Sequence, residues 1–244
     1  MEQGNVFSAY DKGEKTTSAF AVLMRNVYLW MTLALVMTAL TATYVANNPG
    51  WIQALVDFHS KSNGMRFPFY CACGAQLALV WWLSARIMKI SFSTAGLLFA
   101  VYAILNGVTM SILFFVYTAE SIATTFFVTA GMFGAMGLLG YFTKKDLSIM
   151  GRFLLMALIG LIIATIVNIF WANSTLYWIT TYAGILLFAG LTAYDTQKIK
   201  RMLEEHGSEV NENSMKLALL GSLELYLDFI NLFIYLLRIF GNRK

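Results

Sequence analysis

The sequence is poor in the charged residues that soluble proteins carry on their surfaces. Only 12% of its 244 residues are charged, whereas 59% are hydrophobic. A soluble core of this length could not bury so much apolar surface, and large apolar patches would remain in water. The shortage of charge therefore excludes an ordinary soluble domain and points to a lipid bilayer as the solvent.

Proline and cysteine are also scarce, with two residues of each type. Neither Pro49 nor Pro68 lies at the centre of a long apolar run, so such runs are free to form uninterrupted helices. Cys71 and Cys73 lie two residues apart and face different sides of a helix, with no second pair to complete a metal site. We interpret both cysteines as small hydrophobic residues.

Motifs of soluble enzymes are missing as well. The sequence has no phosphate-cradling glycine loop and no HExxH motif, and its two histidines, His59 and His206, fall in predicted loops. These absences predict a protein that is not an enzyme and that needs no organic cofactor.

Seven apolar runs of about 20 residues dominate what is present, and this length matches the hydrocarbon thickness of a membrane. The predicted spans are residues 27–45, 67–85, 94–117, 122–142, 153–170, 176–194 and 217–239. They lack the strict apolar and polar alternation of a porin strand, and backbone groups in lipid must be satisfied internally, so helices are expected. The predicted fold is an all-α, polytopic, seven-helix transmembrane bundle formed by residues 26–244, preceded by a polar tail at residues 1–25.

The distribution of lysine and arginine predicts a cytoplasmic N-terminus, because cytoplasmic loops carry an excess of these residues. With this orientation, only Lys61 and Arg66 lie in the first outside loop. Twelve cations lie inside: Lys12, Lys15, Arg25, Arg86, Lys89, Lys144, Lys145, Arg152, Lys198, Lys200, Arg201 and Lys216. The side of Arg238, Arg243 and Lys244 depends on whether the last run crosses fully or re-enters, which the sequence leaves open. The polar stretch 196–215 is expected to be a solvated loop with a helical turn or two.

Few ionisable residues fall at or within the apolar runs, and these are the candidates for function. A charge at the centre of a membrane helix costs roughly 2.5 to 3.5 kcal/mol on insertion scales, so such residues usually face the bundle interior and have a partner. The acidic candidates are Asp195, Glu224 and Asp228. The basic candidate to meet them is Arg86, at the cytoplasmic end of the second span.

Spacing brings several of these groups together. Glu224, Asp228 and Asn231 are four and three residues apart, so they line one face of the last helix and form a possible ion pathway. Asp195 ends the sixth span on the cytoplasmic side, where the seventh begins, so Asp195 and Asp228 approach one another if the two helices pair. Two close carboxylates cannot both ionise cheaply in a low dielectric, so such a pair would share a proton and sense pH.

Other interpretations of these acids remain open. Asp195 is also compatible with an interfacial residue wetted by headgroups, and Glu224 with the first turn of a helix that starts later. Asp228 is flanked by apolar residues on both sides, which favours burial. Two aspartates on successive helices would also suit an intramembrane protease, a less favoured alternative.

Three segments resemble the Bax inhibitor family of transmembrane proteins. They are TKKDLS at residues 143–148, AYDTQK at 193–198 and SLELYLDFINLF at 222–233. The similarity extends over nearly the whole chain from the first span onward and is strongest in the final third, and it belongs to the bacterial branch of the family.

The resemblance implies a seven-helix bundle with the last helix at its centre and a pH-dependent calcium leak across the membrane. It further implies that Asp195 and Asp228 share the gating proton and that Arg86, at a position that matches less closely, latches the closed state. Some relatives carry an acidic residue on the second helix, where this chain has Gln76 as the nearest polar residue.

We therefore expect a calcium leak channel gated by protonation of Asp195 and Asp228 and modulated by Arg86. Deprotonated carboxylates are hard oxygen ligands, so the same two aspartates are the tentative calcium ligands. The alternative is a non-conducting interaction protein that modulates a membrane-bound protease and docks through its polar tail. The expected partners are lipid, calcium, protons and that protease, with no nucleic acid, and the expected location is a bacterial inner membrane.

Overall fold

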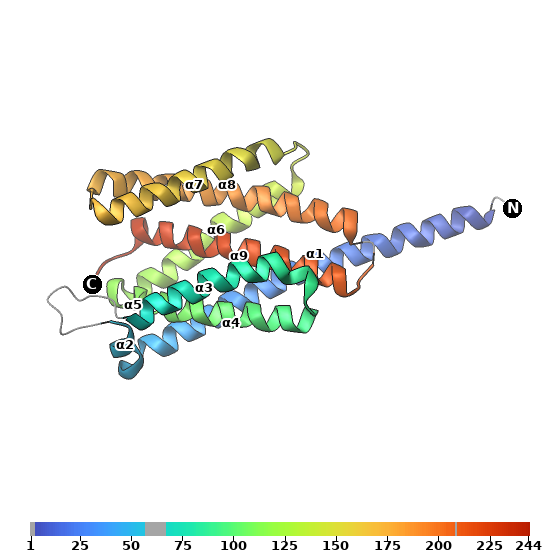
Figure 1. The fold of residues 1–244 in the computed structure, drawn as a ribbon. Helices are drawn as coiled ribbons and strands as arrows, with labels where there is room; N and C mark the ends of the chain where they lie inside the picture. The colour runs from blue at the N-terminus through green and yellow to red at the C-terminus, as the bar shows by residue number, and fades with distance from the viewer. Residues whose placement is uncertain (1–2, 57–66, 208) are drawn as a thin grey trace. The chain divides into compact units, whose positions relative to one another are not determined.

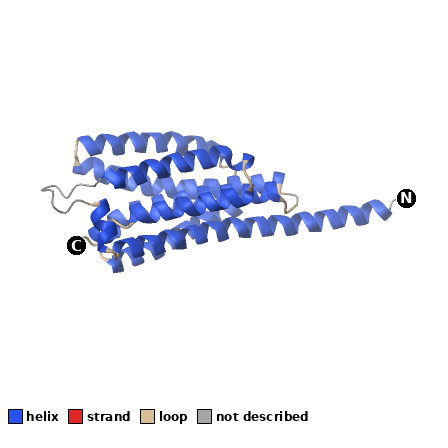
Figure 2. Ribbon diagram, turned by 60° about the horizontal axis from the view of Figure 1, so that its bottom comes forward, coloured by secondary structure: helices blue, strands red, loops and turns tan. Residues whose placement is uncertain are grey.

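The structure is a computed structural model that describes residues 3–56, 67–207 and 209–244, with side chains described from Ala19 onward. Figure 1 colours and labels the helices along the chain, and Figure 2 shows that the described residues are helices and connecting loops. The helices are α1 (Gln3–Ala46), α2 (Pro49–Leu55), α3 (Phe67–Arg86), η1 (Ile87–Lys89), α4 (Phe92–Met110), α5 (Leu113–Val116), α6 (Ala119–Phe142), α7 (Ser148–Phe170), α8 (Ser174–His206) and α9 (Glu212–Phe240). The expected outside-loop residues His59, Lys61 and Arg66 lie outside the described residues.

Seven of these helices are long and apolar enough to cross a membrane, which confirms the predicted all-α membrane fold. The seven are α1, α3, α4, α6, α7, α8 and α9. The expected loop at residues 196–215 is wrong over most of its length, because α8 continues to His206 and α9 already begins at Glu212. Ile199 and Leu203 are fully buried and four residues apart, so this end of α8 is an amphipathic helix with one apolar face.

The chain forms two compact units. Unit one comprises Met1–Val116 and Met202–Leu223, and unit two comprises Tyr117–Arg201 and Glu224–Lys244. The divisions fall within α8 and α9, so both helices contribute residues to both units.

In unit one, α1 packs against α4. The hydroxyl of Thr38 on α1 donates a hydrogen bond of 3.0 Å to the carbonyl of Ala103 on α4. Trp30 and Phe92 meet edge to face, with ring centroids 5.7 Å apart. Polar contacts between membrane helices of this kind hold neighbouring helices in register.

In unit two, small residues bring α8 close to its neighbours. A side chain at Gly140 of α6 would collide with the backbone of Ala193 on α8, and one at Gly151 of α7 would collide with the ring of Tyr194. Two successive residues of α8 are thus in close contact with α6 and α7, immediately before Asp195. Close approach through small residues is a common way for membrane helices to associate.

Helix α9 is the most buried of the seven spans, as the prediction of a central last helix implies. In its most apolar stretch 67% of the residues are buried, against 6% in α7. Within unit two, the ring of Phe229 on α9 packs against Phe126 and Phe133 of α6. Tyr235 of α9 stacks on Phe188 of α8, with centroids 5.8 Å apart.

Contacts of the C-terminal residues show where α9 ends within unit two. Asn242 accepts a hydrogen bond of 3.1 Å from the backbone of Thr118, which precedes α6, and Arg243 lies 3.3 Å from the hydroxyl of Tyr177 near the start of α8. The end of α9 therefore lies beside the starts of α6 and α8, at the opposite end of unit two from the α6–α7 loop. Helix α9 therefore does not fold back within unit two, which agrees with a run that crosses fully.

Candidate functional site

The two aspartates singled out from the sequence lie together in unit two. Asp195 on α8 and Asp228 on α9 have their carboxyl groups within hydrogen-bonding reach of each other. Asp228 is 4% exposed, and the side chain of Asp195 is 14% exposed. Both carboxyl groups are therefore largely removed from water.

A third carboxylate and a lysine complete this group, which we call the carboxyl cluster: Asp195, Lys198, Glu224 and Asp228. The ammonium of Lys198 lies 2.7 Å from Glu224 and 4.0 Å from Asp195. Glu224 lies three turns inside α9, which begins at Glu212, so its placement in the first turn of a later helix is wrong. Sequence reasoning placed Lys198 in a loop, although its spacing of three residues from Asp195 would have paired the two on a continuing helix.

Asn231 lies one turn beyond Asp228 on the same helix. Its side-chain amide donates a hydrogen bond of 2.8 Å to the carbonyl of Leu227 on its own helix, and its side chain lines the same cavity as Asp228. The predicted polar face formed by Glu224, Asp228 and Asn231 is therefore one continuous wall of this cavity.

The cavity adjoining the carboxyl cluster has a volume of about 670 Å³ and is lined entirely by α7, α8 and α9 of unit two. Its polar lining includes all four residues of the carboxyl cluster, together with Arg152 and Asn231. Most of the remaining lining is apolar. The candidate site thus combines charged side chains, most of them on α8 and α9, with an apolar lining supplied mainly by α7.

Arg86, the predicted latch, ends α3 and is exposed. It belongs to unit one, whereas the carboxyl cluster belongs to unit two. Its role as a latch stays a prediction. Gln76, the polar residue of α3 singled out from the sequence, accepts a hydrogen bond of 3.4 Å from Thr109 of α4 within unit one.

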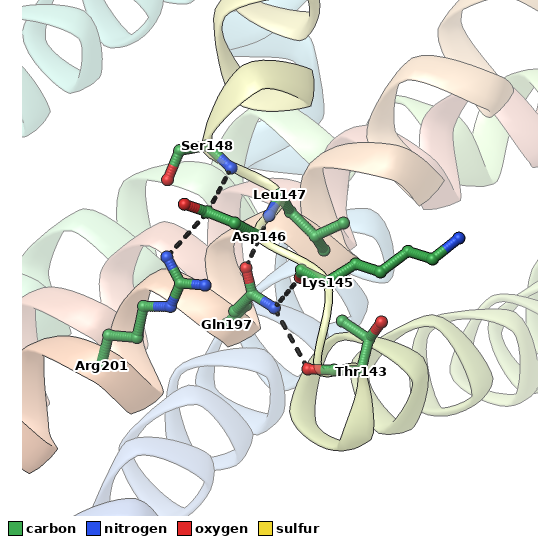
Figure 3. Close-up of polar contacts among 7 residues, drawn as sticks. All are labelled: Thr143, Lys145, Asp146, Leu147, Ser148, Gln197 and Arg201. Atoms are coloured by element: carbon green, nitrogen blue, oxygen red, sulfur yellow. Dashed lines mark hydrogen bonds and ion pairs between the residues drawn. The ribbon is translucent and has the colours of Figure 1, made fainter.

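Hydrogen bonds from Gln197 fasten the α6–α7 loop to α8 (Figure 3), and Gln197 precedes Lys198 of the carboxyl cluster in the chain. The amide oxygen of Gln197 accepts a hydrogen bond of 2.8 Å from the backbone N–H of Leu147, and its amide nitrogen donates to the carbonyls of Thr143 and Lys145. Gln197 is 5% exposed. One buried side chain therefore satisfies three backbone groups of the loop, and we call this set of contacts the loop clamp.

A solvent-exposed ion pair between Asp146 and Arg201 forms a second contact between the α6–α7 loop and α8. Asp146 accepts a hydrogen bond of 2.9 Å from the backbone of Ser148 and lies 2.7 Å from the guanidinium of Arg201. The hydrogen bond from Ser148, together with Arg201, lowers the pKa of Asp146 to about 2. This carboxylate consequently stays charged at neutral and mildly acidic pH, and the ion pair does not respond to pH in that range.

Within the part of the chain that the structure describes, no group of three or more histidine, cysteine, aspartate or glutamate residues is arranged to hold a metal ion. Asp195 and Asp228 supply oxygen ligands. The third carboxylate nearby, that of Glu224, is already paired with the ammonium of Lys198. The tentative calcium ligands thus lie together without forming a complete set of six to eight oxygens.

Comparisons with known proteins agree with the family resemblance of the segments at residues 143–148, 193–198 and 222–233. The family profile described as "Inhibitor of apoptosis-promoting Bax1" matches residues 21–244. The inner membrane protein YbhL of Escherichia coli is 50% identical over 221 residues, which cover 91% of this chain and 92% of that protein. An uncharacterized protein of Deinococcus radiodurans is 41% identical over 231 residues, covering 95% of this chain and 94% of its own length. With a match over nearly its whole length and seven helices able to span a membrane, the chain belongs to the Bax inhibitor family of integral membrane proteins.

Proposed function

We propose that this protein is a pH-dependent calcium leak channel, in which the proton shared by Asp195 and Asp228 sets the balance between closed and open states. The observation that carries the proposal is the burial of Asp228 beside Asp195 on the wall of an intramembrane cavity. Ionisable residues buried in membrane helices are rare, and they mark ion pathways and proton relays.

The pair supports a switch because its two protonation states differ in electrostatic energy. With one proton, the carboxyl groups attract each other through a hydrogen bond. Without it, two negative charges repel each other in a low dielectric, which favours separation of α8 from α9. A proton can shift the equilibrium only because it binds the two conformations with different affinity.

The carboxyl cluster is expected to bind calcium weakly, as a site on a permeation path does, and not to hold it tightly. Asp195, Asp228 and the carbonyl oxygen of Asn231 are hard oxygen ligands, and water would complete the coordination. Conduction requires binding that is weak enough for the ion to leave, so an incomplete ligand set is consistent with a leak. In this proposal Arg86 modulates the closed state, as the family resemblance implies.

The proposed location is a bacterial inner membrane, with the N-terminus in the cytoplasm. The name of the Escherichia coli relative supports the membrane, and the excess of lysine and arginine in the predicted cytoplasmic segments supports the orientation. Lipid, calcium and protons are the partners that this function requires.

The test is calcium flux into dye-loaded proteoliposomes across a series of pH values. We expect flux through the intact protein to vary with pH, and Asp195→Asn and Asp228→Asn each to flatten that variation, because an amide cannot exchange the proton. Glu120→Gln is the matched control, since this exposed carboxylate in the first turn of α6 lies outside the cavity lining. Its pH profile should match that of the intact protein.

Absence of calcium flux at every pH would overturn the leak and leave the second candidate, a non-conducting protein that modulates a membrane-bound protease. One observation favours that candidate: the family profile begins at residue 21, so most of the polar tail lies outside the shared region and is available for a separate role. An adaptor should tolerate both amide substitutions and lose its effect when the tail is deleted.

A further inference from the structure

The cavity of unit two is much larger than a permeating ion requires. Its volume of about 670 Å³ lies within the range of about 300 to 1,000 Å³ found for small-molecule sites. Its lining on α9 extends from Glu224 to Tyr235, eleven residues along the helix, or roughly 16 Å at 1.5 Å per residue. The cavity therefore has the size and length of an elongated organic molecule.

The apolar wall is supplied mainly by α7. Leu155, Leu158, Ile162 and Ile166 line the cavity at spacings of three or four residues, so they form one stripe along the helix. Leu155, Ile162 and Ile166 are 59%, 51% and 49% exposed, so the cavity is open along this wall. A long hydrophobic body could enter from the surrounding lipid and lie against this stripe.

The opposite wall contains a buried acceptor that lacks a donor. Asp228 is 4% exposed, and its Oδ2 accepts no hydrogen bond from any residue that the structure describes. Its neighbour Asp195 brings a second acceptor, and Lys198 lies against Glu224, at 2.7 Å. A buried carboxylate oxygen without a partner is energetically costly, and a cation or a charged donor is the group that would relieve it.

The balance of charge along the cavity points to the same ligand. Three carboxyl groups line it, those of Asp195, Glu224 and Asp228, against two cations, Arg152 and Lys198. Of the charged residues that line the cavity, Arg152 is exposed to solvent, whereas Asp228 is buried. An anionic head placed against Asp228 would be repelled by its carboxylate, and an uncharged head would offer only a neutral donor, which binds a carboxylate more weakly than a charged donor does.

We propose that this cavity is a binding site for amphiphilic organic cations, with the cationic head against Asp228 and the hydrophobic body along the stripe of Leu155, Leu158, Ile162 and Ile166. The proposal shares Asp228 with the calcium leak, but it concerns binding and does not require that any ion crosses the membrane. An organic cation seated there would occupy the ion's place beside the aspartates.

The probe is radiolabelled tetraphenylphosphonium, whose equilibrium binding is measured on the full chain in lipid nanodiscs, with binding to empty nanodiscs subtracted. Decylammonium and decanol serve as competitors because they share a hydrocarbon body and differ in the charge of the head. We expect saturable binding, and competition by decylammonium at least about tenfold stronger than by decanol, which corresponds to about 1.4 kcal/mol.

Two neighbouring residues of α7 provide matched variants. Ile162→Trp fills the cavity from its apolar wall, whereas Ile163→Trp adds the same side chain at a position that is 57% exposed and does not line the cavity. Ile162→Trp should weaken probe binding at least about tenfold, and Ile163→Trp should change it less than about twofold. Asp228→Asn should weaken binding of the probe as well. If this variant fails to fold, the comparison of Ile162→Trp with Ile163→Trp still tests whether the probe binds in the cavity.

Equal competition by decanol and decylammonium would overturn the proposal and identify the cavity as a site for uncharged lipid chains. Binding no greater than that to empty nanodiscs, or equal binding to both tryptophan variants, would overturn it too. The outcome is separable from that of the leak, because probe binding is measured without a gradient. Binding without calcium flux would leave this inference standing while the leak fails.

Discussion

A lysine among three carboxyl groups determines how buried charge is balanced in unit two. Lys198 lies 2.7 Å from Glu224 and 4.0 Å from Asp195, and its side chain is 43% exposed. Its ammonium thus neutralises the outer part of the carboxyl cluster from a partly wet position, while Asp228 remains deeper. Loss of the lysine would leave Glu224, whose side chain is 27% exposed, without its close partner.

Replacement of Lys198 by methionine should therefore destabilise the protein. We expect a loss of about 1 to 2 kcal/mol, at the low end for a charged hydrogen bond because water screens the pair. For a chain of this size the apparent melting temperature in detergent should fall by roughly 2 to 8 °C. Intrinsic tryptophan fluorescence on heating measures it.

The double variant Lys198→Met with Glu224→Met separates the ion pair from other roles of the lysine. Removing both partners takes away the unpaired carboxylate, so the double variant should recover more than half of the lost stability. Lys144→Met, at an exposed lysine of the α6–α7 loop, is the control and should change little. No recovery in the double variant would show that the pairing with Glu224 is not what Lys198 contributes.

The site residues that could be predicted from the sequence are those whose burial follows from their own apolar surroundings. Asp228 lies in such a segment, and its four-residue and three-residue spacings to Glu224 and Asn231 placed all three on one face. Lys198 and Gln197 were not predicted, because both fall in a polar stretch that gives no sign of its tertiary partners. Their roles depend on α8 continuing beyond the apolar run, next to a loop about fifty residues earlier in the sequence.

At the scale of elements, the loop clamp links three helices of unit two. Gln197 on α8 holds the loop that joins α6 to α7, and Gly140 and Gly151 allow both of those helices to approach α8 closely. Movement of α8 relative to α9 would therefore carry the α6–α7 loop with it. A conformational change at Asp195, two residues from Gln197, would reach the α6–α7 loop through this contact.

Gln197→Leu should remove the three hydrogen bonds that hold the α6–α7 loop, while leucine keeps a side chain that favours the α-helix. It leaves the N–H of Leu147 without its partner, at a cost of roughly 1 to 3 kcal/mol if the group stays buried. Amide hydrogen exchange at residues 143–148 should accelerate by roughly tenfold or more, at about 1.4 kcal/mol per tenfold. Hydrogen–deuterium exchange with mass spectrometry on the purified protein measures it.

Lys145→Ala is the matched control for the loop clamp. Lys145 takes part through its backbone carbonyl, and its exposed side chain extends away from Gln197 (Figure 3). Exchange in this variant should stay close to that of the intact protein. Equal acceleration in both variants would mean that the loop responds to any substitution, and an unchanged Gln197→Leu would mean that the clamp does not restrain it.

The helices could be predicted because an apolar run of about 20 residues has few other stable structures in a membrane. Their ends could not, because polar residues allow either a solvated loop or an amphipathic extension. Near the C-terminal end of α8, Ile199 and Leu203 supply two buried positions on one face. That pattern is too short to distinguish a helix from a loop without the partner against which it packs.

At the scale of the whole molecule, the number of crossings fixes the relation between the chain's ends. If all seven candidate helices cross, the two termini are expected on opposite sides of the membrane. With the N-terminus in the cytoplasm, Arg238, Arg243 and Lys244 join Lys61 and Arg66 outside, which makes twelve cations inside against five outside. The bias still favours a cytoplasmic N-terminus, since loop charge near the spans sets orientation.

Reporter fusions test this arrangement directly. Alkaline phosphatase is active only outside the bacterial cytoplasm, whereas green fluorescent protein exported by the general secretion pathway stays dark. We expect a fusion after Lys244 to be active with phosphatase and dark with the fluorescent protein. A fusion truncated after Lys145, which follows four spans, should show the reverse pattern.

The two fusion sites give different information when they fail. Reversal at both sites would mean that the N-terminus is outside and that the charge bias does not set the orientation of this chain. The same side for both sites would mean that an odd number of spans does not separate Lys145 from Lys244, so that one of α7, α8 and α9 does not cross. Because the carboxyl cluster is built from α8 and α9, that second result would remove Asp195 and Asp228 from the path of a transmembrane ion if the helix that does not cross is α8 or α9.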